Sequence, residues 1–148
     1  MRIRKAIEAD IEECVGLALG MIKESWWKEA PFSSEMMRNH AYKYIDDVDR
    51  LYLVAEEEGQ VYGFFSAKVL YTFFGHEINA EQELMYVLPE KRNGITAIKF
   101  MREYEIWARK NNAQLLYFSP TATQRGEWDA LSKRLGYTYL GASYGKRL

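Results

Sequence analysis

The stretch that decides the fold, residues 81–107, reads EQELMYVLPEKRNGITAIKFMREYEIW. Its pattern predicts a strand that ends at Val87, a basic turn that carries Arg92 and Gly94, and then a helix. A helix that begins after such a turn presents backbone N–H groups without intrahelical partners, together with the positive end of its dipole. Both features attract phosphate. The local spacing alone is equally compatible with an ordinary solvated turn.

Length and composition favour a single domain over residues 1–148. The chain has 48% hydrophobic and 15% aromatic residues, and its formal net charge of -1 gives no general attraction to nucleic acid or to acidic membranes. Its single cysteine excludes an intramolecular disulfide and supplies no zinc-ligand spacing. We therefore expect a cytoplasmic protein with no metal, no nucleic-acid partner and no membrane segment.

The region before residue 50 predicts one strand and two helices. Alternation over residues 2–7 is typical of a short strand, and Asp10 and Glu13 have the spacing of a capping box, so a helix should start near Ile11. A second helix is expected after a serine cap at Ser33 or Ser34. Aromatic and polar residues between the helices exceed what two apolar faces need, and part of this surplus could line an acceptor pocket instead of the core: Trp26, Trp27, Phe32, His40 and Tyr42.

The rest of the chain reads as strands around the central helix. Residues 51–56 and 61–70 are separated by a glycine-containing turn and predict a hairpin that leads into the strand of the deciding stretch. After the central helix we expect a short strand at 115–118 and a last helix at about 127–135. The tail over 137–146 is expected to add two strands.

Two carboxylates stand in the strand that leads to the basic turn. Alternation places Glu81, Glu83, Met85 and Val87 on one face of this strand. Such a pair of acids could accept a proton from a substrate, directly or through water. The alternative is that both acids belong to a solvated strand start, and the residues alone do not decide between these interpretations.

The order of these elements resembles the GNAT acetyltransferase family. Residues 83–92, ELMYVLPEKR, are similar to the family's E-x-L-x-V-x-P-x-x-R, and residues 133–137, KRLGY, are similar to its k-l-G-F. The resemblance covers nearly the whole chain. It implies an α/β (α+β) fold with a mixed, mostly antiparallel sheet of six to seven strands flanked by about four helices. It also implies acetyl-CoA as cosubstrate, bound by Met85, Tyr86 and Val87 along the strand and by Arg92, Asn93, Gly94, Ile95, Thr96 and Ala97 in the turn.

The glycine of the turn departs from the family's R/Q-x-x-G-x-G/A pattern. An ungapped count from Arg92 puts Ile95 where the central glycine belongs, so Gly94 lies one place early. A gapped count from Lys91 restores the glycine but leaves Thr96 at the final small position. Because a glycine remains in the turn either way, we expect phosphate binding to survive with altered geometry.

A second departure concerns the proton donor for the departing thiolate. Many family members use a tyrosine five residues before the aromatic of G-F, and Ser132 occupies that position here. A serine hydroxyl is a poorer proton donor, but a thiolate whose conjugate acid has a pKa of about 8.5 can leave without a dedicated acid. Tyr117, Tyr137 and a bound water remain as alternatives.

The resemblance implies direct transfer of acetyl from acetyl-CoA to a primary amine, carried by a small molecule or a protein. An amine with a pKa of about 10 is protonated at neutral pH, so Glu83 is expected to act as base, with Glu81 as the alternative. The enzyme is expected to be a monomer or a homodimer. The competing hypothesis is a catalytically degenerate CoA-binding or protein-interaction module, which Ser132 and the early Gly94 favour.

Overall fold

The computed structural model describes residues 1–119, 125–141, 143, 145 and 146, and among them it contains one mixed sheet of five strands. The strands follow one another across the sheet in chain order. The first four are antiparallel neighbours, and the fifth pairs with the fourth in parallel. They are β1 (Arg2–Lys5), β2 (Arg50–Glu57), β3 (Gln60–Tyr71), β4 (Ile78–Val87) and β5 (Leu115–Tyr117).

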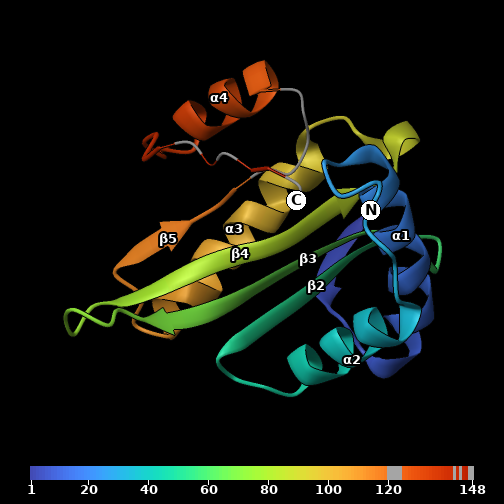
Figure 1. Cartoon of the computed structure of the whole chain (residues 1–148), viewed down its shortest axis with the longest axis horizontal. Coiled ribbons are helices and arrows are strands. Elements are labelled where there is room, and N and C mark those ends of the chain that lie inside the picture. The colour runs from blue at the N-terminus through green and yellow to red at the C-terminus, as the bar shows by residue number, and fades with distance from the viewer. Residues whose placement is uncertain (120–124, 142, 144, 147–148) are drawn as a thin grey trace.

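Helices cover both faces of this sheet (Figure 1). Two helices, α1 (Ile11–Glu24) and α2 (Ser34–Ile45), pack on one face, and α3 (Ile95–Lys110) packs on the other. A fourth, α4 (Arg125–Arg134), follows β5 in the chain, and two short 3-10 helices precede α1 and α3: η1 (Glu8–Asp10) and η2 (Pro89–Lys91). Among the described helices, none has both the length and the apolar character needed to cross a membrane.

The predicted count of six to seven strands is wrong for the part of the chain that the structure describes. Both extra strands were expected in the tail over 137–146, and no described residue of this segment lies in a strand; residues 142 and 144 fall outside the described part. The side chains of Tyr139 and Leu140 are 64% and 67% exposed. A strand of this sheet buries side chains on a sheet face, and the exposure of Leu140 fits a segment that lies outside the sheet.

The hydrophobic core has two layers because the sheet is covered on both sides. Phe64 and Phe65 are adjacent in β3 and both fully buried, so they point to opposite faces. Phe64 packs against the α1 and α2 layer, and Phe65 packs against α3. Burying each phenyl ring contributes about 1.5–3 kcal/mol. Cys14 lies in the first layer, where burial raises the pKa of its thiol to about 12, so it is a packing residue.

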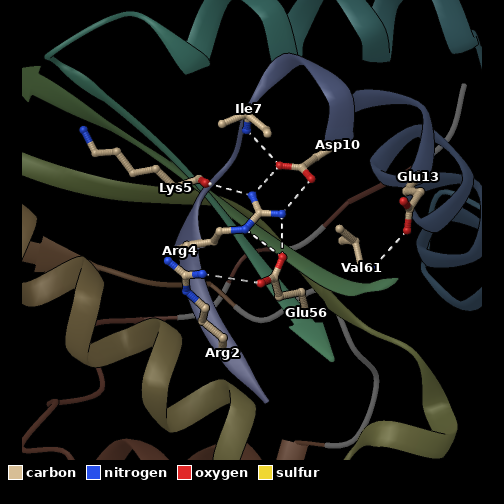
Figure 2. Close-up of polar contacts among 8 residues, drawn as sticks. All are labelled: Arg2, Arg4, Lys5, Ile7, Asp10, Glu13, Glu56 and Val61. Carbon is tan, nitrogen blue, oxygen red and sulfur yellow. Dashed lines mark hydrogen bonds and ion pairs between the residues drawn. The ribbon is translucent and has the colours of Figure 1, made fainter. Parts of the chain in front are cut away.

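The helix starts bear out one predicted cap and correct the other. The Ser33 hydroxyl accepts a hydrogen bond from the Met36 N–H at 3.2 Å, so it caps α2. The predicted Asp10–Glu13 capping box is wrong. Asp10 accepts hydrogen bonds from Arg4 instead, and the Glu13 carboxylate accepts one from the backbone of Val61 at 2.8 Å (Figure 2).

Asp10 belongs to a network that ties the first strand to the start of α1 (Figure 2). Its carboxylate accepts hydrogen bonds from two guanidinium nitrogens of Arg4 at 2.6 and 2.9 Å and from the Ile7 N–H at 2.8 Å. Arg4 also donates to Glu56 of β2 at 2.7 Å. Burial would raise the pKa of Asp10, but the hydrogen bonds from Arg4 and Ile7 outweigh it, and the pKa lies below its ordinary value. The Asp10 carboxylate is thus engaged by Arg4 of β1 and does not cap α1.

A β-bulge in β4 changes which side chains share a face. Ser66 of β3 pairs with Leu84, whereas the next residue of β3 pairs with Gln82, so Glu83 is an extra residue without a cross-strand partner. Beyond the bulge, Met85 and Val87 pack on the α3 side, whereas the Glu83 side chain contacts α2 on the other side. The predicted single face for Glu81, Glu83, Met85 and Val87 is therefore wrong.

Candidate active site

The edge of β4 that faces β5 is paired only in the first half of the strand. Its parallel pairing with β5 covers only Asn79, Ala80 and Glu81, and the next contact across this gap is a 3.0 Å hydrogen bond from the Ser119 N–H to Gln82 Oε1. Beyond that point the strand lines a cavity of about 640 Å³ that reaches the start of α3. We call it the α3-side cavity. An open strand edge offers backbone hydrogen bonds to an extended ligand.

All nine residues predicted to bind the cosubstrate line the α3-side cavity: Met85, Tyr86, Val87, Arg92, Asn93, Gly94, Ile95, Thr96 and Ala97. The structure brings them together, and their contact with CoA stays a prediction. Gly94 stands at the N-cap of α3 with a φ of 77°, a left-handed conformation that favours glycine. Asn93 Oδ1 accepts from the Ile95 N–H at 3.0 Å. Helix geometry leaves the N–H groups of Thr96 and Ala97 without intrahelical acceptors, so they can bind an anion.

Arg92 supplies positive charge to the same cavity but is held by protein groups. Its Nε donates to the Val87 carbonyl at 2.8 Å, and one terminal nitrogen donates to Glu24 Oε2 at 2.7 Å. The other oxygen of Glu24 accepts from the Tyr86 hydroxyl at 2.7 Å. Burial would raise the pKa of Glu24, but the hydrogen bonds from Tyr86 and Arg92 hold it below its ordinary value. An ionised carboxylate therefore competes with any bound phosphate for Arg92.

Two helices complete the α3-side cavity with residues that sequence reasoning missed. Helix α1 contributes Met21 and Glu24, Ser25 follows its last turn, and α4 contributes Trp128, Leu131 and Arg134. These residues lie far from the deciding stretch in sequence and carry no spacing signal. For α4, the k-l-G-F resemblance over 133–137 was the only sequence sign that this helix lies near the site.

A second cavity, of about 380 Å³, lies against α2, and we call it the α2-side cavity. Its walls come from α1, from residues 30–33 and from α2, and β4 contributes Glu83 and Leu84. Met21 lines both cavities, and the β4 residues of one directly precede those of the other. The two cavities therefore share a wall at Met21 and take consecutive residues of β4. Of the aromatic surplus noted in the sequence, Phe32 and His40 line this cavity, whereas Trp26 and Trp27 are 58% and 53% exposed.

Glu83 is the acidic group of the α2-side cavity, and it is already paired. Its carboxylate accepts hydrogen bonds from the Tyr44 hydroxyl and from Lys68 Nζ, the latter at 2.6 Å. Burial would raise its pKa, but the bonds from Lys68 and Tyr44 outweigh burial and lower it. Glu81 lies farther from the same ammonium, at 3.7 Å from Lys68 Nζ, and its side chain is 42% exposed against 22% for Glu83.

His40 adds a neutral imidazole to the same cavity. Its ring stacks on Tyr44 with centroids 4.2 Å apart, and its Nε2 is buried without a hydrogen-bond partner among the described residues. Burial lowers the pKa of His40, so the ring is neutral near pH 7 and Nε2 can accept a hydrogen bond if it carries no proton. The sequence placed His40 only in the aromatic surplus.

The hydroxyl of Ser132 faces its own helix. It donates to the Trp128 carbonyl at 2.5 Å, and Ser132 is not among the residues that line the α3-side cavity. Neither Tyr117 nor Tyr137 lines it either, and Tyr137 instead packs in the α3-side core, where burial raises its pKa to about 12. Among the described residues, no side chain at these positions is placed to protonate a thiolate in the cavity.

Comparison with known proteins assigns the chain to a family. The profile of the acetyltransferase (GNAT) family matches residues 19–137, which is more than half of the chain. The chain belongs to the GNAT acetyltransferase family. No curated protein sequence matches this acetyltransferase significantly.

Solved structures share the fold of this acetyltransferase at low sequence identity. The aminoglycoside 6'-N-acetyltransferase AAC(6')-IG from Acinetobacter haemolyticus is 20% identical, with a TM-score of 0.73 and coverage of 100% of this chain and 99% of its own. AAC(6')-Iy in complex with CoA is 14% identical, with a TM-score of 0.77 and coverage of 99% and 93%. The ribosomal-protein-alanine N-acetyltransferase from Brucella melitensis biovar Abortus 2308 is 16% identical, with a TM-score of 0.72 and coverage of 99% and 98%. At these identities, the likeness shows the fold.

Proposed function

We propose that this GNAT acetyltransferase moves the acetyl group of acetyl-CoA to a primary amine by direct attack. The observation that carries the proposal is that two cavities share Met21 and take consecutive residues of β4 as lining. One offers an open strand edge, a helix start and Arg92, which suit a pantetheine arm and a pyrophosphate. The other offers Glu83 and His40 beside apolar walls, which suit an amine.

The α3-side cavity supplies the contacts for acetyl-CoA. Met85, Tyr86 and Val87 would pair through their backbone with the pantetheine arm, and their N–H groups would polarise the thioester carbonyl. Residues 92–97 would hold the pyrophosphate through Arg92 and the N–H groups at the start of α3. Arg92 would exchange its hydrogen bond with Glu24 for one with a phosphate oxygen.

Glu83 is the proposed base, with Glu81 as the alternative. An incoming ammonium must lose a proton before its nitrogen can attack, and Glu83 lines the α2-side cavity two residues before Met85, which lines the other cavity. Because the pKa of Glu83 is lowered, the residue is ionised when the amine arrives and attracts the ammonium before accepting its proton. The departing thiolate would leave without a dedicated side-chain acid, which its moderate basicity allows, and the second proton of the amine nitrogen would pass to this thiolate directly or through water.

The test of this function combines acetyl-CoA titration by calorimetry with an assay of thiol release over a panel of primary amines. We expect saturable binding of acetyl-CoA and turnover with at least one amine. Binding without turnover for any amine would instead support the degenerate binding module. A chain that does not bind acetyl-CoA would overturn both interpretations.

A further inference from the structure

The lining of the α2-side cavity is mostly apolar, and the inference drawn from it rests on the proposed function. We propose that its acceptor is a small monoamine with an apolar body, and that polyamines and polyhydroxylated aminoglycosides are rejected. Nine of the twelve described residues that line the cavity are apolar: Ala18, Met21, Ile22, Ala30, Pro31, Phe32, Met36, Met37 and Leu84. The three methionines have flexible, polarisable side chains that can adapt to apolar ligands of different shapes.

The polar groups of the cavity fix one end of the acceptor. Glu83 and His40 face the cavity, and Tyr44 links them because its ring stacks on His40 and its hydroxyl donates to Glu83. Ser33, the third polar residue of the lining, is engaged in capping α2. An ammonium beside Glu83 therefore finds the one carboxylate of the described lining. The rest of the acceptor lies against the apolar side chains of the cavity.

A polycation would bring more charge than this cavity can compensate. Glu83 is the one carboxylate among the described lining residues, and it already shares its charge with Lys68 Nζ at 2.6 Å, so it can compensate one further ammonium at most. A second ammonium would lie against apolar walls, where an unpaired charge is strongly disfavoured. The hydroxyl groups of an aminoglycoside would likewise lose water without gaining hydrogen bonds. The volume of about 380 Å³ lies near the lower end of the range for small-molecule pockets.

The inference is tested by comparing acceptors at saturating acetyl-CoA. Initial rates of thiol release give kcat/KM for 2-phenylethylamine, spermidine and kanamycin with the full chain. We expect 2-phenylethylamine to exceed both of the others by at least about tenfold, the discrimination that an uncompensated buried polar or charged group provides. Equal or higher kcat/KM with spermidine or kanamycin would overturn the inference.

A charge added to the cavity wall sharpens the test. Met36 is 74% exposed at the cavity rim, so Met36→Glu should fold and supply a second carboxylate. We expect it to shift the ratio of kcat/KM between spermidine and 2-phenylethylamine towards spermidine by at least about threefold. Val48→Glu is the matched control, because Val48 is 79% exposed and is not among the lining residues. An equal shift in both variants would contradict a role for the cavity.

Binding separates this inference from the proposed function. Should none of the amines be acetylated, the transfer reaction fails as a proposal. Calorimetric titration of the same three amines into the chain then still decides the ligand class. Tighter binding of 2-phenylethylamine upholds an apolar monoamine site, and no preference or no binding overturns it.

Discussion

The two cavities are built in different ways. The α3-side cavity takes nine of its lining residues from one stretch of chain, 85–97, and uses a strand edge and a helix start. The α2-side cavity is assembled from side chains of α1, the following loop, α2 and β4. Backbone groups in a local motif suit a ligand that is the same in every member of a family. Side chains from separate segments can change one at a time, so they suit an acceptor that differs between members.

The largest expected effect comes from replacing Glu83, the proposed base. Glu83→Gln keeps the size of the side chain and its bonds to Tyr44 and Lys68 in part, but it removes the proton acceptor. We expect turnover to fall by about 100-fold or more, the usual contribution of a general base. The affinity for acetyl-CoA should change little, because Glu83 does not line the α3-side cavity.

Glu81→Gln is the control for this variant, since Glu81 is more exposed and farther from Lys68 Nζ. We expect a smaller loss of turnover. A larger loss in Glu81→Gln than in Glu83→Gln would transfer the role of base to Glu81.

Arg92→Ala tests the other cavity. Loss of a charged hydrogen bond to the pyrophosphate should weaken acetyl-CoA binding by about 1 to 3 kcal/mol, or about 5- to 150-fold in Kd. Calorimetry measures this change. Lys91→Ala removes the neighbouring cation, which is paired with Glu57 at 2.6 Å and lies outside the described lining. Equal weakening in both variants would show that charge near the turn matters and that the specific position of Arg92 does not.

The α3-side cavity was largely predictable because its determinants are contiguous. The strand, the basic turn and the helix start follow one another in 81–107, and the left-handed φ of Gly94 explains why a glycine remains there. Its α1 and α4 walls were not predictable, because nothing in the local sequence links Glu24 or Trp128 to this stretch. Tertiary packing alone places them.

The α2-side cavity was predicted only in part: Phe32, His40 and Glu83 were candidates, but their arrangement was missed for two physical reasons. Alternation assumes an unbroken strand, and the extra residue at Glu83 reverses the faces of β4 beyond it. The position of His40 depends on two ring contacts. One is with Tyr44, one helical turn away in α2, and the other is with an aromatic ring of β2. The same limit explains the tail, where a plausible strand pattern over 137–146 found no partner strand among the described residues.

Glu24→Gln should change the affinity for acetyl-CoA modestly and in the opposite direction to Arg92→Ala. The carboxylate of Glu24 holds Arg92 at 2.7 Å and lies in the cavity proposed for a pyrophosphate, so it competes for the guanidinium and repels the ligand. Removing its charge should tighten acetyl-CoA binding by about two- to fivefold, the effect of one partly solvated charge. Weaker binding in calorimetry would mean that Glu24 positions Arg92 for the ligand.

The smallest change is expected in kcat/KM as a function of pH. This profile distinguishes proton removal by Glu83 from attack by an amine that is already neutral. Lys68 and Tyr44 lower the pKa of Glu83 below its ordinary value of 4.5, while Glu81, His40 and Arg50 are the other charged or titratable groups close enough to influence Glu83 or its partners. A base with a lowered pKa is already ionised at pH 5, and activity should be lost only as the pH falls through that lowered pKa. With Glu83 as base and an ammonium acceptor with a pKa of about 10, kcat/KM should stay within about threefold from pH 6 to pH 9.

The alternative is distinguishable in the same measurement. If the enzyme used only the free amine, kcat/KM would rise about tenfold per pH unit below the amine pKa, because the neutral fraction rises by that factor. Such a rise in the wild-type enzyme would remove Glu83 from the mechanism as a base. A flat profile that becomes a tenfold rise per unit in Glu83→Gln would assign the proton transfer to Glu83. An acidic limb below pH 6.5 that survives in Glu83→Gln would assign it to His40, because burial lowers the pKa of His40 from its ordinary value of 6.5.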